Sequence, residues 1–472
     1  MPVHRLREDP RRRPAGRDQG RDPVKTVIEN AAIATVDRAG TEHASGHVVI
    51  ENDRITAVGA GKAPGGDYDE RVDGSGCLVT PGLINTHHHL YQWATRGLAA
   101  DHTLFEWLVA LYPIWGRLDA EITHAAATAG LARLATTGCT TVADHHYVFP
   151  RDGGDQVEAL AAARIRVGVR LHVVRGSMDR GESQGGLPPD NLVEETEAAL
   201  LGTEAAIDRF HDASAEAHLQ IAAGPCSPFS VSERLMTGAA ELARRKGIRL
   251  HTHLAETIDE EKQCLAEVGC TPAEYADKLG WLAEDVWLAH SIHLAPEAIR
   301  RLGATGTGAA HCPTSNGRIG AGIAPVRHLL DAGVAVGLGV DGAASNESGG
   351  LGEELHQSLL QARQRGGPRA LTTREALWMG TMGGARCLGR EKDLGSIEAG
   401  KLADLAVWNL NGLNYAGITD PVAALVLGAT PPVERLFVGG TTVVTGGTLR
   451  EESEDEIARE LAVASARLRE TV

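Results

Sequence analysis

Between residues 81 and 393 the sequence alternates between amphipathic helical segments and short apolar segments typical of buried strands. Apolar residues recur at helical spacing over 120–137 and 232–247, and each of these segments is followed by a compact apolar run. The expected strands include 140–143, 164–174, 220–223, 248–251, 286–289 and 334–340. Strands that alternate with helices over this length predict a parallel sheet, and the repetition favours an α/β fold closed as a (β/α)8 TIM-type barrel.

Two shorter β-rich regions flank the expected barrel. Short apolar runs separated by Gly, Asn and Asp fill residues 25–80, and β character returns between 394 and 450. We expect these two segments to pack together as one small β-sandwich domain. A charged, Ala- and Leu-rich segment at 451–472 predicts a closing helix. Residues 1–24 predict a disordered basic tail, because they are rich in arginine and contain no apolar stretch.

The overall composition excludes several classes of partner. The chain has 472 residues and a formal net charge of −16, so it lacks the basic face that phosphate neutralisation requires, and no nucleic acid is expected as a partner. No apolar run reaches the length of about 18 residues that spans a bilayer, so no membrane association is expected. The seven cysteines show no C-x-x-C spacing, which is typical of reduced thiols and favours a cytoplasmic location.

Histidines gather at the predicted ends of two strands. His87 and His89 leave one apolar run, and His253 leaves another. Because alternate residues of a strand share a face, His87 and His89 are expected to point together while His88 points away. Buried histidines are costly unless a ligand satisfies them, so these positions predict a metal site.

Further polar residues end neighbouring strands. His290 follows the run at 286–289, Asp341 follows the run at 334–340, and Glu256 lies three residues beyond His253. The carboxyl ends of barrel strands form the face on which barrel enzymes build their active sites. We therefore expect these side chains to meet the histidine cluster in one pocket.

A donor set of three imidazoles and one carboxylate suits Zn²⁺, and Fe²⁺ or Mn²⁺ less well. The predicted ligands are His87, His89, His253 and Asp341. An open coordination position would hold a water molecule whose pKa the ion lowers towards neutrality. We then expect Asp341 to take a proton from this water and Glu256 to carry it to the substrate. His290 is expected to hydrogen-bond the water or the developing oxyanion.

Together these residues resemble the amidohydrolase superfamily, and the resemblance spans about residues 26–450. Its markers here are the H-x-H at 87–89, a strand-5 histidine at 253, a strand-6 histidine at 290 and a strand-8 aspartate at 341. The binuclear branch of the superfamily bridges two metals with a strand-4 lysine. We assign residues 171–176 to that strand, and they contain no lysine. The resemblance therefore implies a single metal ion.

The H-x-x-E spacing of His253 and Glu256 is similar to the branch that includes cytosine, guanine and S-adenosylhomocysteine deaminases. In that branch the glutamate relays a proton to the ring nitrogen, and the strand-6 histidine is a catalytic partner and not a ligand. Further segments resemble the bacterial 8-oxoguanine deaminases, namely 81–92, 175–178, 184–190, 225–232, 311–313 and 339–346. The resemblance implies hydrolytic deamination of an aminated oxo-purine or related small heterocycle. The first expected substrate is 8-oxoguanine, which would give urate and ammonia.

Other activities share much of this sequence pattern. Triazine hydrolases have a similar skeleton, but their dechlorinating branch can lose the strand-8 aspartate, which is present here as Asp341. Deamination is therefore favoured over a triazine-type chloro- or aminohydrolase. Isocytosine, isoxanthopterin and guanine are alternative substrates. A non-enzymatic scaffold would be expected to lose metal ligands, all of which are kept, and related barrels imply a homo-oligomer.

Several side chains are candidate substrate contacts besides Glu256 and His290. Gln92 completes an H-x-H-x-x-Q pattern, and the matching glutamine of related guanine deaminases binds the purine edge. Arg175, placed at the end of the fourth strand, could bind a carbonyl or anionic ring edge, or pair with a barrel carboxylate. Aromatic residues that could stack on a flat ring or belong to the core are Tyr91, Trp115 and Phe229.

Two more histidine positions end predicted strands. Asp144-His145-His146 ends the second strand, where we expect pocket lining or hydrogen-bonded support and no further metal site. His311 ends the seventh strand, where we expect it to orient a loop.

Overall fold

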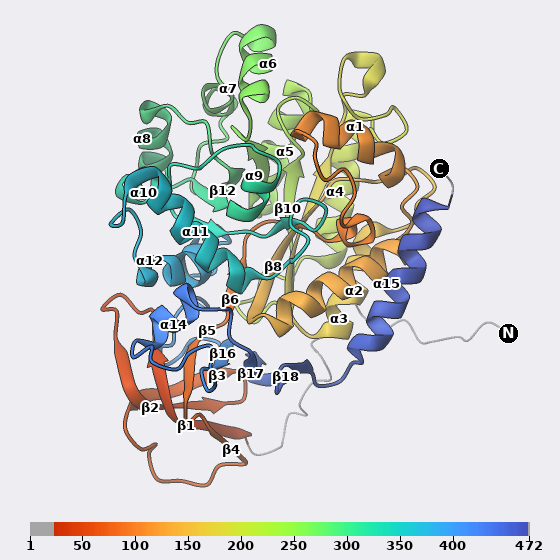
Figure 1. Cartoon of the computed structure of the whole chain (residues 1–472). Coiled ribbons are helices and arrows are strands. Elements are labelled where there is room, and N and C mark those ends of the chain that lie inside the picture. Colours follow the sequence, from red (N-terminus) through yellow and green to blue (C-terminus); the bar gives the residue numbers. More distant parts are fainter. Residues whose placement is uncertain (1–22, 471–472) are drawn as a thin grey trace, which may run out of the picture.

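Eight parallel strands close into a barrel in the middle of the chain (Figure 1). The computed structural model describes residues 23–470, so most of the tail expected over 1–24 lies outside the described residues. In chain order the barrel strands are β6 (Leu83–Asn85), β8 (Cys139–His146), β9 (Arg170–Ser177), β10 (Leu219–Pro225), β11 (Leu250–Leu254), β12 (Val286–His290), β13 (Gly308–His311) and β14 (Val336–Leu338). The predicted (β/α)8 barrel is confirmed.

Helices cover the outside of the barrel. They include α2 (Ala120–Thr136), α3 (Gln156–Val167), α4 (Thr196–Phe210), α5 (Glu233–Lys246), α8 (Pro296–Thr305) and α11 (Leu351–Gly366). Inside the barrel, small and apolar side chains such as Ile84, Val174 and Ala222 pack around Trp287. The barrel is thus filled, and any open space must lie at the ends of its strands.

The expected strand over 164–174 is wrong in its first half. Residues up to Val167 end helix α3, whose cap residue Gly168 has a φ of 90°, and the strand begins only at Arg170. Apolar residues alternate with arginine and histidine on both sides of the glycine, as they do in a strand, which hid the boundary between helix and strand. A glycine in the left-handed conformation is a common helix end.

The strand that contains residues 171–176 is the third of the barrel and not the fourth. Counting from β6, the order β6-β8-β9-β10 makes β10 the fourth strand. Its sequence, Leu219–Pro225, also contains no lysine. The fourth strand therefore offers no lysine that could bridge two metals. The prediction of a missing lysine is the same, although residues 171–176 belong to the third strand.

Strands from both ends of the chain form one nine-stranded sheet beside the barrel. The N-terminal strands are β1 (Lys25–Ala34), β2 (Glu42–Glu51), β3 (Arg54–Ala60), β4 (Glu70–Asp73) and β5 (Cys77–Pro81), and the C-terminal ones are β16 (Leu405–Asn409), β17 (Val433–Val438), β18 (Thr441–Thr445) and β19 (Thr448–Leu449). Antiparallel pairing of β5 with β16 joins the two sets. The sheet has its own core, which includes Ile28, Ile50 and Phe437.

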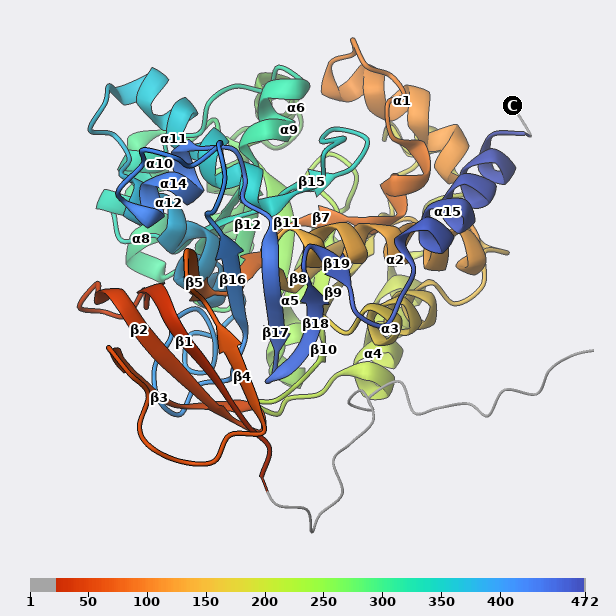
Figure 2. The ribbon, with the colours of Figure 1, turned by 60° about the horizontal axis from the view of Figure 1, so that its bottom comes forward.

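Figures 1 and 2 place this sheet at the opposite end of the barrel from α1 (Leu104–Trp115) and α6 (Ile258–Val268). The C-terminal helix α15 (Glu454–Arg469) runs along α2, and the Ser465 hydroxyl donates to the carbonyl of Ala94 at 2.5 Å. Within residues 23–470, no helix is both long and apolar enough to cross a membrane.

Candidate active site

Buried polar side chains converge at the carboxyl end of the barrel. His87 follows β6, His253 lies on β11, and His290 ends β12. His89 and Asp341 belong to a separate two-stranded sheet, β7 (His88–His89) and β15 (Asp341–Gly342), which joins the ends of the first and eighth barrel strands. The chain thus brings residues from distant segments to one point, as the barrel fold predicts.

The four residues predicted to be metal ligands lie together. His87 Nε2 and His89 Nε2 lie 3.3 and 3.2 Å from Asp341 Oδ1. His89 Nε2 lies 3.1 Å from His253 Nε2. These distances are those of donor atoms that share one coordination sphere, since zinc binds nitrogen and oxygen donors at about 2.0–2.2 Å.

The hydrogen bonds of His89 and His253 fix the tautomer of each ring. His89 Nδ1 donates to the carbonyl of His145 at 2.6 Å, and His253 Nδ1 donates to the carbonyl of Cys226 at 2.6 Å. Because a carbonyl oxygen only accepts, the hydrogen is on Nδ1, and the Nε2 lone pairs face each other. Two lone pairs at 3.1 Å repel each other, and a cation between them removes this repulsion.

His87 presents its Nε2 atom in the same way. His251 Nδ1 donates to the carbonyl of Trp287 at 2.7 Å, so His251 Nε2 must accept the 2.8 Å hydrogen bond from His87 Nδ1. His87 Nε2 is buried and has no hydrogen-bond partner among the described residues. Burial also lowers the pKa of both His87 and His253 well below the usual value, which keeps the rings neutral, as metal ligands must be. The donor set fits a divalent cation.

His88 is turned away from this cluster. Its Nδ1 donates to the carbonyl of Asp341 at 2.5 Å, and its Nε2 accepts from Trp93 Nε1 at 3.2 Å. Both ring nitrogens are therefore occupied. The alternation of side chains expected at 87–89 is present in the structure.

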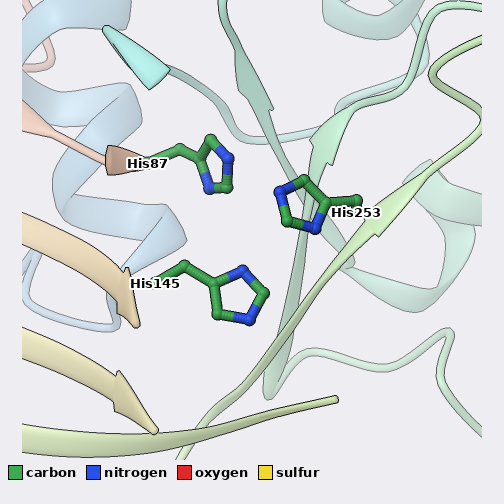
Figure 3. A group of neighbouring side chains, drawn as sticks. All are labelled: His87, His145 and His253. Carbon is green, nitrogen blue, oxygen red and sulfur yellow. The ribbon is translucent and has the colours of Figure 1, made fainter. Parts of the chain in front are cut away.

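His145, on β8, contacts two of the expected ligands. Figure 3 shows its ring beside those of His87 and His253, and the three offer nitrogen atoms that lie within 4.8 Å of one another. Its Nε2 donates to the carbonyl of Gly224 at 2.8 Å, and its ring stacks on His253 with centroids 4.9 Å apart. Since its backbone carbonyl also accepts from His89, His145 braces two of the four expected ligands.

Glu256 and His290 face Asp341 on the other side of the donor set. Glu256 Oε1 lies 3.5 Å from His290 Nε2, and donor atoms of Glu256, His290 and Asp341 lie within 4.8 Å of one another. Burial, together with the negative charges of Asp341 and Glu260, raises the pKa of Glu256 well above the usual value. A buried carboxyl group of this kind can hold a proton near neutral pH and release it to a substrate.

The backbone at this end of the barrel is strained. Ala255, His290, Ser291 and Asp341 have φ values of 53°, 68°, 53° and 60°. This left-handed conformation is unfavourable for residues other than glycine, and such residues cluster at functional sites. The strain coincides with the ends of the strands that carry Glu256, His290 and Asp341.

A cavity opens onto the cluster. One face of α1 forms most of its apolar wall. Its polar floor is formed by Gln92 together with His89, His253, Glu256, His290 and Asp341. The apolar and aromatic lining residues are Leu104, Trp107, Leu108, Tyr112, Tyr147, Phe229 and Ile319. Of the stacking candidates, Phe229 lines the cavity, whereas Tyr91 and Trp115 pack in the core.

Gln92 lies in this cavity, as expected of a substrate contact. Its side chain is fully buried, and neither its Oε1 nor its Nε2 atom has a hydrogen-bond partner within the described part of the chain. A buried amide without partners is costly, and a bound polar molecule would satisfy it. The remaining polar lining residues that the sequence did not indicate are Cys226, Ser227 and Ser345.

Arg175 lies elsewhere. Its neighbour Val174 points into the barrel, and strand alternation therefore turns Arg175 outward. There it makes two 2.7 Å hydrogen bonds to the carboxylate of Glu194, stacks on Phe149 with 4.0 Å between its guanidinium carbon and the ring centroid, and lines a different pocket. The structure thus gives Arg175 the carboxylate pairing that was the alternative to a substrate contact.

Comparison with known proteins shows which family the sequence belongs to. The model of the amidohydrolase family matches residues 78–443. The 8-oxoguanine deaminase of Pseudomonas aeruginosa is 45% identical over 94% of this chain and 99% of its own length. An isoxanthopterin deaminase from an unknown prokaryotic organism is 37% identical over 89% of this chain and 92% of its own length.

Solved structures agree. A triazine hydrolase variant superposes with a TM-score of 0.90 at 31% identity, covering 94% of this chain and 99% of its own. The atrazine chlorohydrolase of Arthrobacter aurescens in complex with zinc gives a TM-score of 0.89 at 31% identity, covering 93% of this chain and 100% of its own. The chain therefore belongs to the amidohydrolase family.

Proposed function

We propose that this protein is a metal-dependent hydrolase that deaminates 8-oxoguanine to urate and ammonia. The observation that carries the proposal is the 45% identity with the 8-oxoguanine deaminase of Pseudomonas aeruginosa over 94% of the chain. The geometry supports it, since the donor set and the pair Glu256 and His290 meet at the floor of a single cavity. In the balanced reaction, water replaces the exocyclic amino group and ammonia leaves.

We propose zinc as the metal, held by His87, His89, His253 and Asp341. Three neutral imidazoles and one carboxylate are typical of zinc, and a related hydrolase of known structure is complexed with zinc. Zinc held there would lower the pKa of a bound water molecule towards neutrality and act as a Lewis acid. Fe²⁺ and Mn²⁺ are the alternatives to test.

Glu256, Asp341 and His290 each have a different role in proton transfer. Glu256, whose pKa is raised, holds a proton beside the cavity and can give it to a ring nitrogen. Asp341 lies within the donor set, 3.2–3.3 Å from the Nε2 atoms of His87 and His89, and we assign it the proton that leaves the attacking water. His290 Nε2 lies 3.5 Å from Glu256 Oε1 and can accept a hydrogen bond from the attacking water.

The lining of the cavity suits a neutral free base. Among residues 23–470 no lysine or arginine lines the cavity, so no cationic side chain is available there for a phosphate or carboxylate. The apolar wall from α1 would leave ribose hydroxyls without partners, which costs about 1–3 kcal/mol for each buried group. Gln92 offers one donor and one acceptor to the edge of a planar ring.

An ammonia-release assay tests the proposal. Purified zinc-loaded protein is given 8-oxoguanine, isoxanthopterin, guanine, isocytosine and a chloro- and an alkylamino-triazine, with ammonia, chloride and alkylamine measured in parallel. We expect the highest kcat/KM for 8-oxoguanine, with urate formed in equal amount to ammonia. Faster release of chloride or alkylamine from a triazine would contradict deamination, and a higher kcat/KM for isoxanthopterin would reassign the substrate.

We further propose a cytoplasmic homo-oligomer. All seven cysteines are unpaired and buried, in agreement with a reducing compartment. Light scattering after size-exclusion chromatography measures the assembly, and a molar mass equal to one 49.8 kDa chain would contradict it.

A further inference from the structure

Helix α9 (Pro313–Arg318) contacts two side chains of the active site in a single turn. Asn316 accepts a hydrogen bond at Oδ1 from His290 Nδ1 at 2.9 Å. The preceding residue, Ser315, donates its hydroxyl hydrogen to Asp341 Oδ2 at 2.6 Å. All four side chains are buried. The short helix α9 thus holds both His290, at the end of β12, and Asp341, which follows β14.

We propose that Ser315 and Asn316 are positioning residues for the reaction, acting through Asp341 and His290. The inference rests on the proposed function, because it assigns how that function's machinery is oriented. Neither residue lines the cavity, so neither is expected to touch the substrate.

Asn316 fixes the tautomer and the plane of the His290 ring. A carbonyl oxygen only accepts, so the ring hydrogen is held on Nδ1 and the lone pair is left on Nε2. Nε2 is the atom that faces Glu256. Without the amide oxygen, the ring is free to rotate or to carry its hydrogen on the other nitrogen, and either change removes the acceptor from the cavity.

Ser315 holds the Asp341 carboxylate in one orientation. Its hydrogen bond occupies Oδ2, while Oδ1 accepts from the Gly342 backbone at 2.7 Å and approaches the imidazoles at 3.2–3.3 Å. Ser345, 2.9 Å from Ser315, donates to the carbonyl of Gly342 at 3.1 Å. Of the two acceptors near the Ser315 hydroxyl, Ser345 Oγ at 2.9 Å and Asp341 Oδ2 at 2.6 Å, the nearer and charged carboxylate takes its hydrogen. Partners of this kind orient the ligands of a metal site.

Helix α11 fixes α9 in place. Glu354 Oε2 accepts from the Thr314 backbone at 3.1 Å, and Glu354 Oε1 accepts from Asn346 Nδ2 at 2.8 Å. Gln361 Nε2 donates to the carbonyl of Pro313 at 2.6 Å. A helix of six residues has little stability of its own. These contacts give α9 the rigidity that a positioning role needs.

Paired substitutions test the two residues. Ser315→Ala removes the hydroxyl and Ser315→Thr keeps it, while Asn316→Leu removes the acceptor and Asn316→Asp keeps it in a side chain of similar shape. We expect kcat to fall by about 10- to 100-fold in Ser315→Ala and Asn316→Leu, the range seen when partners of metal-site residues are removed. KM should stay near the wild-type value, and Ser315→Thr and Asn316→Asp should recover most of kcat.

Release of zinc to a chromogenic chelator gives a readout that needs no substrate. Ser315→Ala should release zinc about 10-fold faster than wild type or Ser315→Thr. Ser358→Ala is the matched control, since it removes a buried hydroxyl that donates only within α11, to Leu355 at 3.0 Å. It should match wild type. If Ser315→Thr does not fold, the comparison of Ser315→Ala with Ser358→Ala remains.

Equal zinc release from Ser315→Ala and Ser358→Ala would overturn the role of Ser315. Equal kcat for Asn316→Leu and wild type, or equal losses in Asn316→Leu and Asn316→Asp with a lowered Tm, would overturn that of Asn316. Wild-type protein without activity on 8-oxoguanine would contradict the proposed function instead, and the chelator experiment would still decide the role of Ser315.

Discussion

Two buried groups of charged side chains, one at each end of the barrel, differ in how completely they are paired. Near the β-sheet, Arg170 binds Asp404 through two hydrogen bonds of 2.9 and 3.0 Å. The same guanidinium donates to the carbonyls of Glu216 and Ala217, and Asp404 also accepts from the Gly439 backbone at 2.8 Å. The protein itself thus supplies hydrogen-bond partners to both charged groups of this ion pair.

At the carboxyl end the pairing is incomplete. His87 Nε2 and both amide atoms of Gln92 have no hydrogen-bond partner among residues 23–470. Glu256 and His290 are 3.5 Å apart, at the limit of a hydrogen bond. Burial is similar in the two places, so burial alone does not mark the active site. Unpaired buried atoms also occur elsewhere in the described part of the chain, as at His172 and Arg390. The active site differs because unpaired atoms, a carboxyl group of raised pKa and a cavity occur together there.

The largest expected effect follows from breaking the donor set. His253→Ala removes one of the four expected ligands, so bound zinc and deaminase activity should both be lost. Metal analysis of the purified variant and an ammonia-release assay measure this. Retention of one equivalent of zinc with full activity would show that His253 is not a ligand.

Glu256→Gln separates catalysis from metal binding. The amide keeps the shape of the side chain but cannot carry the proton, so kcat should fall by about 10²- to 10⁴-fold. Zinc content should equal that of wild type. A variant that has lost its zinc would show that Glu256 acts as a ligand and not as a proton carrier.

Arg170→Met breaks the fully paired cluster instead. It leaves the Asp404 carboxylate buried without its partner, so the free energy of unfolding should fall by about 3–5 kcal/mol. The kcat of the folded protein should not change, because the pair lies near the sheet and away from the cavity. Denaturant unfolding and kinetics below the transition measure the two properties. A variant with wild-type stability and lowered kcat would reverse the contrast between the two ends.

Gln92→Ala should have the smallest effect among the substitutions within the active site. It removes a contact to the ring edge, and kcat/KM for 8-oxoguanine should fall by about 10-fold, as for one lost hydrogen-bond partner. Stability should hold or rise, since an unpaired buried amide is removed. Arg175→Met is the comparison, because this arginine is paired with Glu194 outside the cavity. It should leave kcat/KM unchanged, and a loss equal to that of Gln92→Ala would return Arg175 to the substrate site.

The sequence made the barrel and the convergence of His87, His89, His253 and Asp341 predictable. Strand alternation sets which histidines share a face, and the carboxyl ends of parallel strands meet at one end of a barrel. Both rules are local or topological and need no contact information. The same local reasoning failed at residues 164–174, where an alternating pattern continues across Gly168 from helix to strand. It also misnumbered the strand of Arg175, because the order of strands in the barrel is not a local property.

Other features depend on contacts between distant segments. Ser315 meets Asp341 across 26 residues, and His89 meets the carbonyl of His145 across 56. The largely apolar sequence of α1 indicates that much of the helix is buried. It does not indicate that the helix forms a wall of the cavity. The sequence alone thus determined which residue types stand at the strand ends, because backbone geometry has a fixed period. Only the tertiary structure decided which polar atoms are paired and which are left for an ion and a substrate, because pairing depends on distances between side chains that no local pattern encodes.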